Sequence, residues 1–468
     1  MDGSPTGGCG TTKVKDMNKT FSLIATLAIM AALPAMAQDT APAEAAVEAV
    51  AEAAVAGVTP DVAYIFNTLL FLIGGFLVMW MAAGFAMLEA GLVRSKNVTT
   101  QLFKNVAVFA IAGIMYWIVG YNLMYPGDSW TVTGWIGQIF VPKGIDAVAA
   151  GVADDGYSAG SDFFFQLMFC ATTASIVSGT LAERVRLWAF IAFTVVLTGI
   201  IYPIEASWQW GGGWLSEMGF SDFAGSTLVH ATGGFAALAG ALVLGARYGK
   251  YRPDGRMQPM PGSNLALATL GTFILWLGWF GFNGASQLAI GSINDAADVS
   301  RIFVNTNMAA SAGAVAAIIT TQLAFGKIDL TMVLNGALAG LVSITAEPLA
   351  PSVLAAILIG GVGGIVAVLV VPLLDRMKID DVVGAIPVHL VAGVWGTLIV
   401  PATNAETSYV TQFIGVFAIG LFTFVVSLAV WLVIKATIGI RVSQEAEMTG
   451  LDISEMGMEA YPDFVQAK

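Results

Sequence analysis

Two stretches of the chain decide its fold: residues 222–234 (DFAGSTLVHATGG) and residues 381–393 (DVVGAIPVHLVAG). They share the pattern D-x6-V-H-x3-G, and their histidines, His230 and His389, are the only two in the chain. Both histidines lie inside apolar segments. Eight helical residues rise about 12 Å, which is close to half of a hydrocarbon core about 30 Å thick. The spacing therefore predicts that each imidazole lies near the middle of a membrane, where it is costly unless it is paired or lines a pathway.

The composition of the whole chain indicates a membrane protein. Of its 468 residues, 57% are hydrophobic and 11% are charged, whereas an ordinary soluble domain has about a quarter charged residues. Its 53 glycines are spread through the apolar runs, as in membrane helices whose backbones approach one another closely. Apolar runs of roughly 18 or more residues predict eleven membrane spans, centred near residues 75, 112, 172, 195, 236, 274, 315, 337, 363, 391 and 422.

The basic residues indicate the orientation of these spans. With the N-terminus outside, the predicted outer loops hold only Lys143 and Arg301, as the positive-inside rule requires. The spans of the two histidines then run in opposite directions. We therefore expect an all-α polytopic fold with an inverted repeat of five plus five spans and one further C-terminal helix. The basic residues assigned to the inner loops and the tail are Arg94, Lys96, Lys104, Arg184, Arg186, Arg247, Lys250, Arg252, Arg256, Lys327, Arg376, Lys378, Lys435, Arg441 and Lys468.

The N-terminal segment has the features of a secretory leader. Three lysines precede the apolar stretch 21–33, and small residues follow it up to Ala37, which predicts a start at Met17 and cleavage after Ala37. An uncleaved anchor span is the alternative. The predicted organisation is a leader at 1–37, an acidic, alanine-rich extracytoplasmic stretch at 38–60, a membrane domain at 61–437 and a solvated cytoplasmic tail at 438–468.

The residue inventory argues against several function classes. Cys9 and Cys170 are the only cysteines, too few for a disulfide framework or a cysteine-rich metal site, and we expect Cys170 to be a small packing residue. No H-E-x-x-H motif or other catalytic constellation indicates an intramembrane hydrolase. A serine nucleophile beside His230 stays open, although no motif marks one. The sequence thus predicts a protein that is not an enzyme and that holds no metal ion or cofactor. The formal net charge of -12 argues against nucleic-acid binding.

Aromatic motifs lie near the outer ends of several spans. Taken singly, each is typical of interfacial anchoring or packing. Together with other motifs in the same order, they strongly resemble the ammonium transporter (Amt/Mep/Rh) family in its bacterial Amt type, from about residue 62 to about residue 461. The motifs are residues 208–214 (WQWGGGW), 163–169 (FFFQLMF), 278–286 (GWFGFNGAS), 222–230 (DFAGSTLVH), 182–184 (AER), 84–91 (GFAMLEAG), 450–455 (GLDISE) and 459–461 (EAY).

The resemblance implies a pore within each subunit and a role for six side chains. A small cation is attracted by the faces of aromatic rings by about 0.5–2 kcal/mol each, and a serine hydroxyl accepts a hydrogen bond from an N–H donor. The implied roles are ammonium recruitment at Trp210, Phe169 and Ser286, a phenylalanine gate of Phe169 and Phe282, and pore histidines at His230 and His389.

Asp222 matches a family acid close to the recruitment site. Its place just before the fifth span suits a helix N-cap equally well, so we expect a structural role with long-range help to the cation. We interpret Asp381 and Glu183 as loop and cap residues.

Selectivity against potassium predicts the mechanism. Ammonium and potassium have similar size and charge, but only ammonium has a proton to lose. An apolar pore penalises any intact ion by several kcal/mol while neutral ammonia passes. We therefore expect deprotonation near the vestibule and conduction of ammonia, with or without separate proton transfer.

The resemblance also implies a setting and partners. It implies a lipid-embedded homotrimer in the bacterial inner (plasma) membrane, and a tail that contacts PII-type signalling proteins. Met456 and Met458 stand where family tails commonly carry polar residues, which puts the PII contact in doubt. Two alternatives keep the fold: an ammonium sensor, against which the short tail argues, and a transporter of another small amine such as methylammonium.

Overall fold

The computed structural model describes residues 58–126, 156–254 and 256–462. The predicted leader at 1–37, nearly all of the stretch at 38–60 and the predicted outer loop with Lys143 lie outside the described residues. Pro60–Lys468 forms one compact unit. Its described part is built from helices, with two isolated β-bridges, Val185 to Arg441 and Tyr251 to Met257.

Nine helical segments of the described part are long and apolar enough to cross a membrane, and two shorter apolar helices accompany them. These eleven segments agree with the eleven predicted from the sequence. The nine are α3 (Pro60–Leu92); Ser95–Met124, with α4 (Val98–Met115) and α5 (Tyr121–Met124); α7 (Ala159–Thr180); Leu187–Ser207, with α8 (Leu187–Val196) and α9 (Tyr202–Ser207); Ser226–Leu244, with η5 (Ser226–Ala231) and α11 (Thr232–Leu244); Leu265–Gln287, with α12 (Leu265–Gly284) and η6 (Ala285–Gln287); α13 (Ile293–Phe325); α15 (Val353–Arg376); and α17 (Tyr409–Thr437). The two shorter ones are α14 (Leu330–Ile344) and Ile386–Ala402, with η7 (Ile386–Val391) and α16 (Ala392–Leu398).

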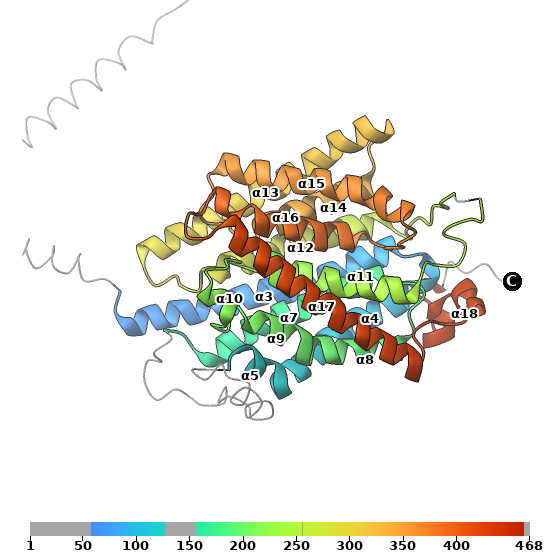
Figure 1. The fold of residues 1–468 in the computed structure, drawn as a ribbon, viewed down its shortest axis with the longest axis horizontal. Coiled ribbons are helices and arrows are strands. Elements are labelled where there is room, and N and C mark those ends of the chain that lie inside the picture. Colours follow the sequence, from blue (N-terminus) through green and yellow to red (C-terminus); the bar gives the residue numbers. More distant parts are fainter. Residues whose placement is uncertain (1–57, 127–155, 255, 463–468) are drawn as a thin grey trace, which may run out of the picture. The chain divides into compact units, whose positions relative to one another are not determined.

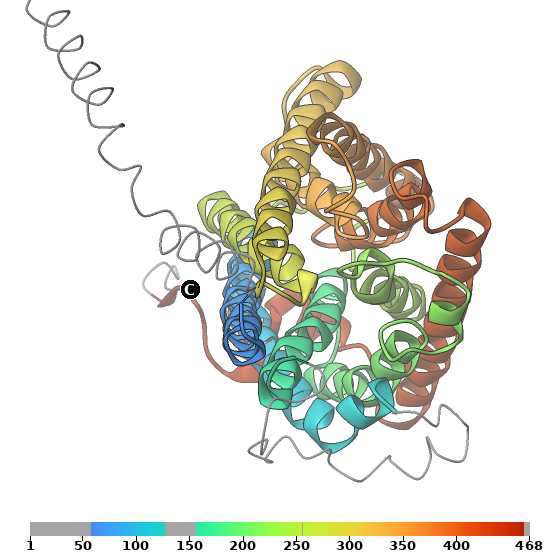
Figure 2. The ribbon, with the colours of Figure 1, turned by 90° about the vertical axis from the view of Figure 1, so that its left-hand side faces the viewer.

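The long helices form a bundle that Figure 1 shows from the side and Figure 2 from one end. α3 packs along α12, and α13 packs against α14 and α15. Large apolar side chains point away from the bundle: Val106 is 71% exposed and Leu323 is 81% exposed. Water would penalise such a surface, whereas lipid tails would not. The protein is therefore a multi-pass membrane protein.

The two histidine-bearing helices begin in the same unusual way. Each starts with a π-helical turn, η5 or η7, a few residues after an aspartate. Gly225 (φ 101°) and Gly384 (φ 79°) precede these turns in a left-handed conformation that glycine adopts at little cost. His230 therefore lies only four residues after the helix start at Ser226. The expectation of eight helical residues between Asp222 and His230 was wrong, because the chain from Asp222 to Gly225 is not helical.

The same two helices touch each other through reciprocal glycines. A Cβ on Gly234 would lie 2.6 Å from the backbone nitrogen of Leu390, the residue after one histidine. A Cβ on Gly393 would lie 2.4 Å from the carbonyl oxygen of Ser226 and 3.2 Å from the nitrogen of Ala231, the residue after the other histidine. The inverted repeat thus meets backbone against backbone, with equivalent residues exchanging roles across the contact.

One end of the bundle carries buried ion pairs. Glu183 lies within 2.5 Å of the Arg94 guanidinium and 3.3 Å of that of Arg247, while Arg247 also binds Asp380 at 2.9 Å. Burial acts to raise the pKa of Glu183, but Arg247 and Arg94 more than offset this effect, so that its pKa lies below the usual value. The pKa of Asp380 is likewise lowered, since Arg184 and Arg247 outweigh its burial.

The tail packs against this same end, opposite α10 (Trp214–Glu217), as Figure 1 shows. It contains α18 (Gln444–Thr449) and η9 (Asp452–Met456). The Asp452 carboxylate accepts hydrogen bonds from the backbone N–H groups of Thr99 and Thr100 at 2.9 and 2.8 Å, at the start of α4. The expectation of a simply solvated tail was wrong for this part, because the contact buries Asp452.

Lys104 also departs from its predicted place. The count of basic residues assigned it to an inner loop, but it lies within α4 and is 2% exposed. Its Nζ donates a hydrogen bond to the carbonyl of Ser178 at 2.8 Å and lies 4.8 Å from the centre of the Phe190 ring. These partners allow a lysine to stay inside an apolar segment.

Replacing Gly393 with alanine should destabilise the protein, because its methyl group would press on the backbone of Ser226. Overpacking of this kind typically costs about 1–3 kcal/mol. Thermal unfolding in detergent measures it. Gly361→Ala is the matched control, since a Cβ there has no neighbour within 4 Å. Equal melting temperatures for the two variants would contradict the tight contact.

Candidate functional site

The outer part of the predicted site joins Trp210 to Phe169. Trp210 follows α9 in the segment 208–213, and its Nε1 donates a hydrogen bond to the carbonyl of Asp222 at 3.0 Å. Phe169 comes from α7, and its ring meets that of Trp210 edge to face, with the centroids 5.8 Å apart. Trp210 is half-buried, while Phe169 is buried. The two rings therefore connect a partly open site with the core.

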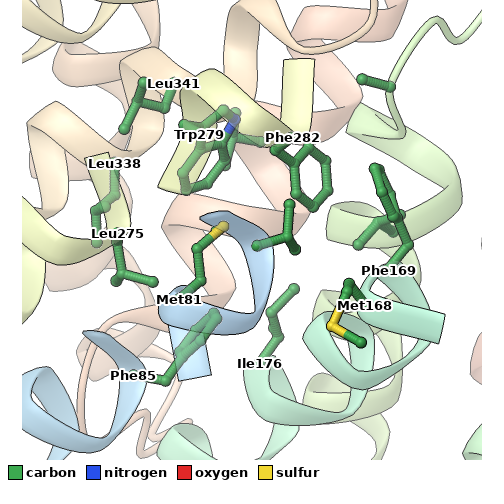
Figure 3. Close-up of a cluster of buried hydrophobic side chains, with 14 of the residues drawn as sticks. Met81, Phe85, Met168, Phe169, Ile176, Leu275, Trp279, Phe282, Leu338 and Leu341 are labelled. Atoms are coloured by element: carbon green, nitrogen blue, oxygen red, sulfur yellow. The ribbon is translucent and has the colours of Figure 1, made fainter. Parts of the chain in front are cut away.

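Phe169 and Phe282 form the next ring contact. Their ring centroids are 4.2 Å apart at an interplanar angle of 36°, and both side chains are buried. Figure 3 shows Phe169 on α7 facing Phe282 on α12. The predicted pair is thus in direct contact and closes the space between the two helices.

The histidines continue this stack of rings. His230 lies against Phe282 with centroids 5.2 Å apart, and His389 follows at 5.2 Å from His230. The two Nδ1 atoms are 3.2 Å apart. For a hydrogen bond at this distance one Nδ1 must carry a proton and the other must accept it, so the two neutral rings hold opposite tautomers at Nδ1. Phe85 of α3 lies beyond His389 with centroids 6.3 Å apart. We call Trp210, Phe169, Phe282, His230 and His389 the ring column.

Ser286 joins the ring column only indirectly. It lies in η6, half-buried, and its Oγ donates a hydrogen bond to the carbonyl of Phe282 at 2.7 Å. This bond uses the hydroxyl proton and leaves the oxygen lone pairs as acceptors.

Asp222 lies beside the column and faces the helix start. Its carboxylate accepts hydrogen bonds from the backbone N–H groups of Gly225, Ser226, Thr227 and Leu228 at 2.7–3.1 Å. Asp222 is fully buried. This carboxylate therefore serves as the hydrogen-bond acceptor for the first N–H groups of η5, as an N-cap side chain does.

Asp381 acts in the same way at the other repeat. Its carboxylate accepts hydrogen bonds from the N–H groups of Gly384 and Ile386 and from the Thr180 hydroxyl. The glycine three residues after each aspartate was an unused signal, because D-x2-G occurs at both Asp222 and Asp381.

Sequence reasoning missed Trp279. Its ring stacks on His230 with centroids 4.9 Å apart, and its Nε1 donates a hydrogen bond to the Thr345 hydroxyl at 2.8 Å. Figure 3 shows Trp279 and Phe282 on the same helix. The spacing of three residues was the available signal, since it places both side chains on one face of a helix. In the described part of the chain, no group of three or more metal-ligating side chains comes together.

Comparison with known proteins decides the family. The model of the Ammonium Transporter Family matches residues 69–461. The chain belongs to this family. Among curated relatives, the ammonium transporter Amt2 of Archaeoglobus fulgidus is 43% identical over 84% of this chain and 88% of its own length. A putative ammonium transporter of Synechocystis is 41% identical over 85% of this chain and 89% of its own length.

Solved structures in this ammonium transporter group share the fold. A structure titled "Sensor Amt Protein" has a TM-score of 0.78 and 35% identity, covering 85% of this chain and 100% of that one. Mep2 of Candida albicans has a TM-score of 0.73 and 26% identity, covering 85% of this chain and 92% of that one. The resemblance stated from the motifs is confirmed, and so is the all-helical polytopic fold.

Replacing Asp222 with alanine should lower stability strongly, because four buried N–H groups would lose their acceptor. We expect a loss of about 2–4 kcal/mol, measured by thermal unfolding in detergent. Asp295→Ala is the control, since Asp295 completes an exposed capping box at the start of α13 and should cost about 1 kcal/mol or less. Equal losses would argue against a structural role for Asp222.

Proposed function

We propose that this protein recruits ammonium at an aromatic outer vestibule, removes one proton and conducts ammonia through a pore lined by His230 and His389. Membership of the ammonium transporter family supports ammonium as the substrate. The observation that carries the finer proposal is the ring column, which runs in unbroken contact from half-buried Trp210 to buried His389.

Recruitment depends on Trp210, Phe169 and Ser286. A cation beside the two rings gains about 0.5–2 kcal/mol from each, and the Ser286 oxygen, whose own proton is directed to Phe282, accepts an N–H of the ion. Such a vestibule attracts potassium as well as ammonium. Recruitment alone therefore does not give selectivity.

Selectivity arises below the vestibule. Phe169 and Phe282 are in contact and fully surrounded by core residues, so an ion passing them loses its hydration without compensation. Ammonium escapes this cost by leaving its proton behind as it enters, whereas potassium has no such route. The two phenylalanines thus act as a gate for the neutral molecule.

The histidines offer a neutral pathway that is both apolar and able to hydrogen-bond. Both rings are buried, and Nε2 of His230 has no hydrogen-bond partner among the described residues. An ammonia molecule, which has both a lone pair and N–H groups, fits such an unused nitrogen whichever way it is protonated. Such a role gives a reason for the two imidazoles to lie inside a membrane domain despite the energetic cost of burying them there.

The setting follows from the surface and the charges. We place the protein as a homotrimer in the bacterial plasma membrane, surrounded by lipid, with the N-terminus outside and the end that carries Arg94, Arg247 and α18 in the cytoplasm. A PII-type signalling protein is the proposed partner at that end. The docked tail, in which Met456 is half-buried and Met458 is 54% exposed, is where such a partner would bind.

A second candidate function is ammonium sensing. The solved structure titled "Sensor Amt Protein" shares the fold at 35% identity. Transport of another small amine, such as methylammonium, is a third. Uptake into vesicles separates these functions, because a sensor binds ammonium without net flux, and paired assays with ammonium and methylammonium rank the two solutes.

Replacing His230 or His389 with alanine should abolish selective uptake of ammonium, because each change opens the ring column and removes a hydrogen-bonding nitrogen. Uptake into proteoliposomes under ammonium and potassium gradients measures this effect. Thr269→Ala, at an exposed position of α12, is the control and should behave as wild type. Normal ammonium flux with intact potassium exclusion in both histidine variants would refute the role of the pair.

A further inference from the structure

Glu89 is a carboxylate inside α3 that the ring column does not use. It is 1% exposed. Three donors approach it, Gln101 Nε2 at 2.5 Å, Asn105 Nδ2 at 2.6 Å and Ser178 Oγ at 3.1 Å, and all three bind the same oxygen, Oε2. Its other oxygen, Oε1, accepts no hydrogen bond from the described residues. Half of this buried carboxylate is therefore held in place, and half is free to accept a proton.

Lys104 is the charged group that faces Glu89 most closely. Its Nζ donates a hydrogen bond to the Ser178 carbonyl at 2.8 Å and forms no ion pair within 4 Å of the carboxylate. An ammonium group at this remove lowers the cost of a buried anion. It does so without occupying Oε1.

A small cavity connects Glu89 with the end of the ring column. Its volume is about 10 Å³, and Glu89 and His389 both line it, together with Ile176 and Val383. This is about the space of one water molecule. Oε1 lies on the Val383 side, because a Cβ on Gly179 would be 2.8 Å from Oε1 and 2.5 Å from Cγ2 of Val383. One water in this cavity would lie between the histidine and the free oxygen.

A second cavity lies at the end of the bundle that carries the ion pairs, where Arg247 lines it. It has a volume of about 410 Å³, and polar residues such as Asp375 and Lys250 line it. The two cavities share Asn335, Val383 and Gly384 in their walls, and Asn335 Nδ2 donates a hydrogen bond to the Val383 carbonyl at 3.1 Å. The two cavities are therefore neighbours that border on the same three residues.

We infer that Glu89 accepts the proton that leaves the twin histidines on the cytoplasmic side. An N–H bond of protonated His389 breaks as its proton passes to the water in the small cavity, and an O–H bond of that water breaks as the Oε1–H bond forms. His389 returns to the neutral form, and Glu89 later releases the proton to water in the larger cavity. The inference rests on the proposed function. It takes that function in the form in which the proton crosses separately from ammonia, and it names the residue that receives the proton.

The alternative is that Glu89 only ties α3 to α4 and α7. That role needs Oε2 alone, and glutamine keeps an oxygen for it. Proton transfer needs Oε1 as a base, which glutamine lacks. Glu89→Gln thus separates the two roles at nearly constant volume.

The test uses the full chain in proteoliposomes and records two signals, the current evoked by ammonium and the pH of the lumen. In the wild type a proton crosses with each ammonia, so a current flows and the lumen does not become alkaline. Glu89→Gln should reduce the current by at least about tenfold, as expected for loss of a proton-transfer group, and ammonia that crosses alone should make the lumen alkaline. Glu445→Gln, the same change at an exposed site of α18, should behave as the wild type in both signals.

Each other outcome overturns a defined claim. A wild type that gives neither current nor alkalinisation refutes the proposed function, whereas wild-type alkalinisation without current refutes only the role of Glu89. An unchanged current in Glu89→Gln, or a folded variant that gives neither signal, also refutes that role. If Glu89→Gln does not fold, Gly179→Ala decides, because its methyl would crowd Oε1 and Val383. Its current should fall while the lumen becomes alkaline, and an unchanged current would overturn the inference.

Discussion

The site depends on the contact between the two histidine-bearing helices, where Gly234 and Gly393 each admit the backbone of the other repeat. A lipid environment offers no hydrophobic force between helices, so association depends on close packing and on satisfied polar groups. The hydroxyls of Thr227 and Thr397 add a hydrogen bond of 2.6 Å across the same contact. His230 and His389 are held in register because their neighbours in sequence form this contact, and the aromatic rings stack outward from there.

Much of this arrangement follows from residue types and their spacing. Long apolar runs require helices in a membrane, and a pattern repeated around two histidines requires two equivalent helices. The aromatic motifs carried the resemblance that brought Trp210, Phe169 and Phe282 into one site. These predictions succeeded because each depends on local composition or on an ordered set of motifs.

Other features depend on tertiary contacts and were not predicted from the sequence. The π-helical starts coincide with bonds from backbone N–H groups to a preceding carboxylate, Asp222 at η5 and Asp381 at η7. No helix propensity scale describes such bonds. Lys104 was assigned to a loop because a lysine ordinarily avoids apolar surroundings, yet Ser178 and Phe190 compensate it from other helices. Trp279 was visible only as one of several aromatic residues on α12. In each case the deciding partner lies far away in sequence.

Two buried carboxylates lie on either side of the histidine pair, and they differ in how their oxygens are hydrogen-bonded. Asp222 directs both oxygens to backbone N–H groups and is fully satisfied. Glu89 satisfies one oxygen and leaves the other beside a cavity. A fully bonded carboxylate stabilises a fixed geometry, whereas a half-bonded one keeps a chemical capacity.

The docking of the tail affects the order in which the chain is completed. The first N–H groups of α4 find their acceptor in Asp452, which is 352 residues further along the chain from Thr100. During synthesis α4 therefore enters the membrane domain with an unfinished end, and only the last part of the chain to be made closes it. A chain that ended before the tail would leave the N–H groups of Thr99 and Thr100 on its second span without this acceptor. Loss of the tail would therefore be felt at the start of the membrane domain.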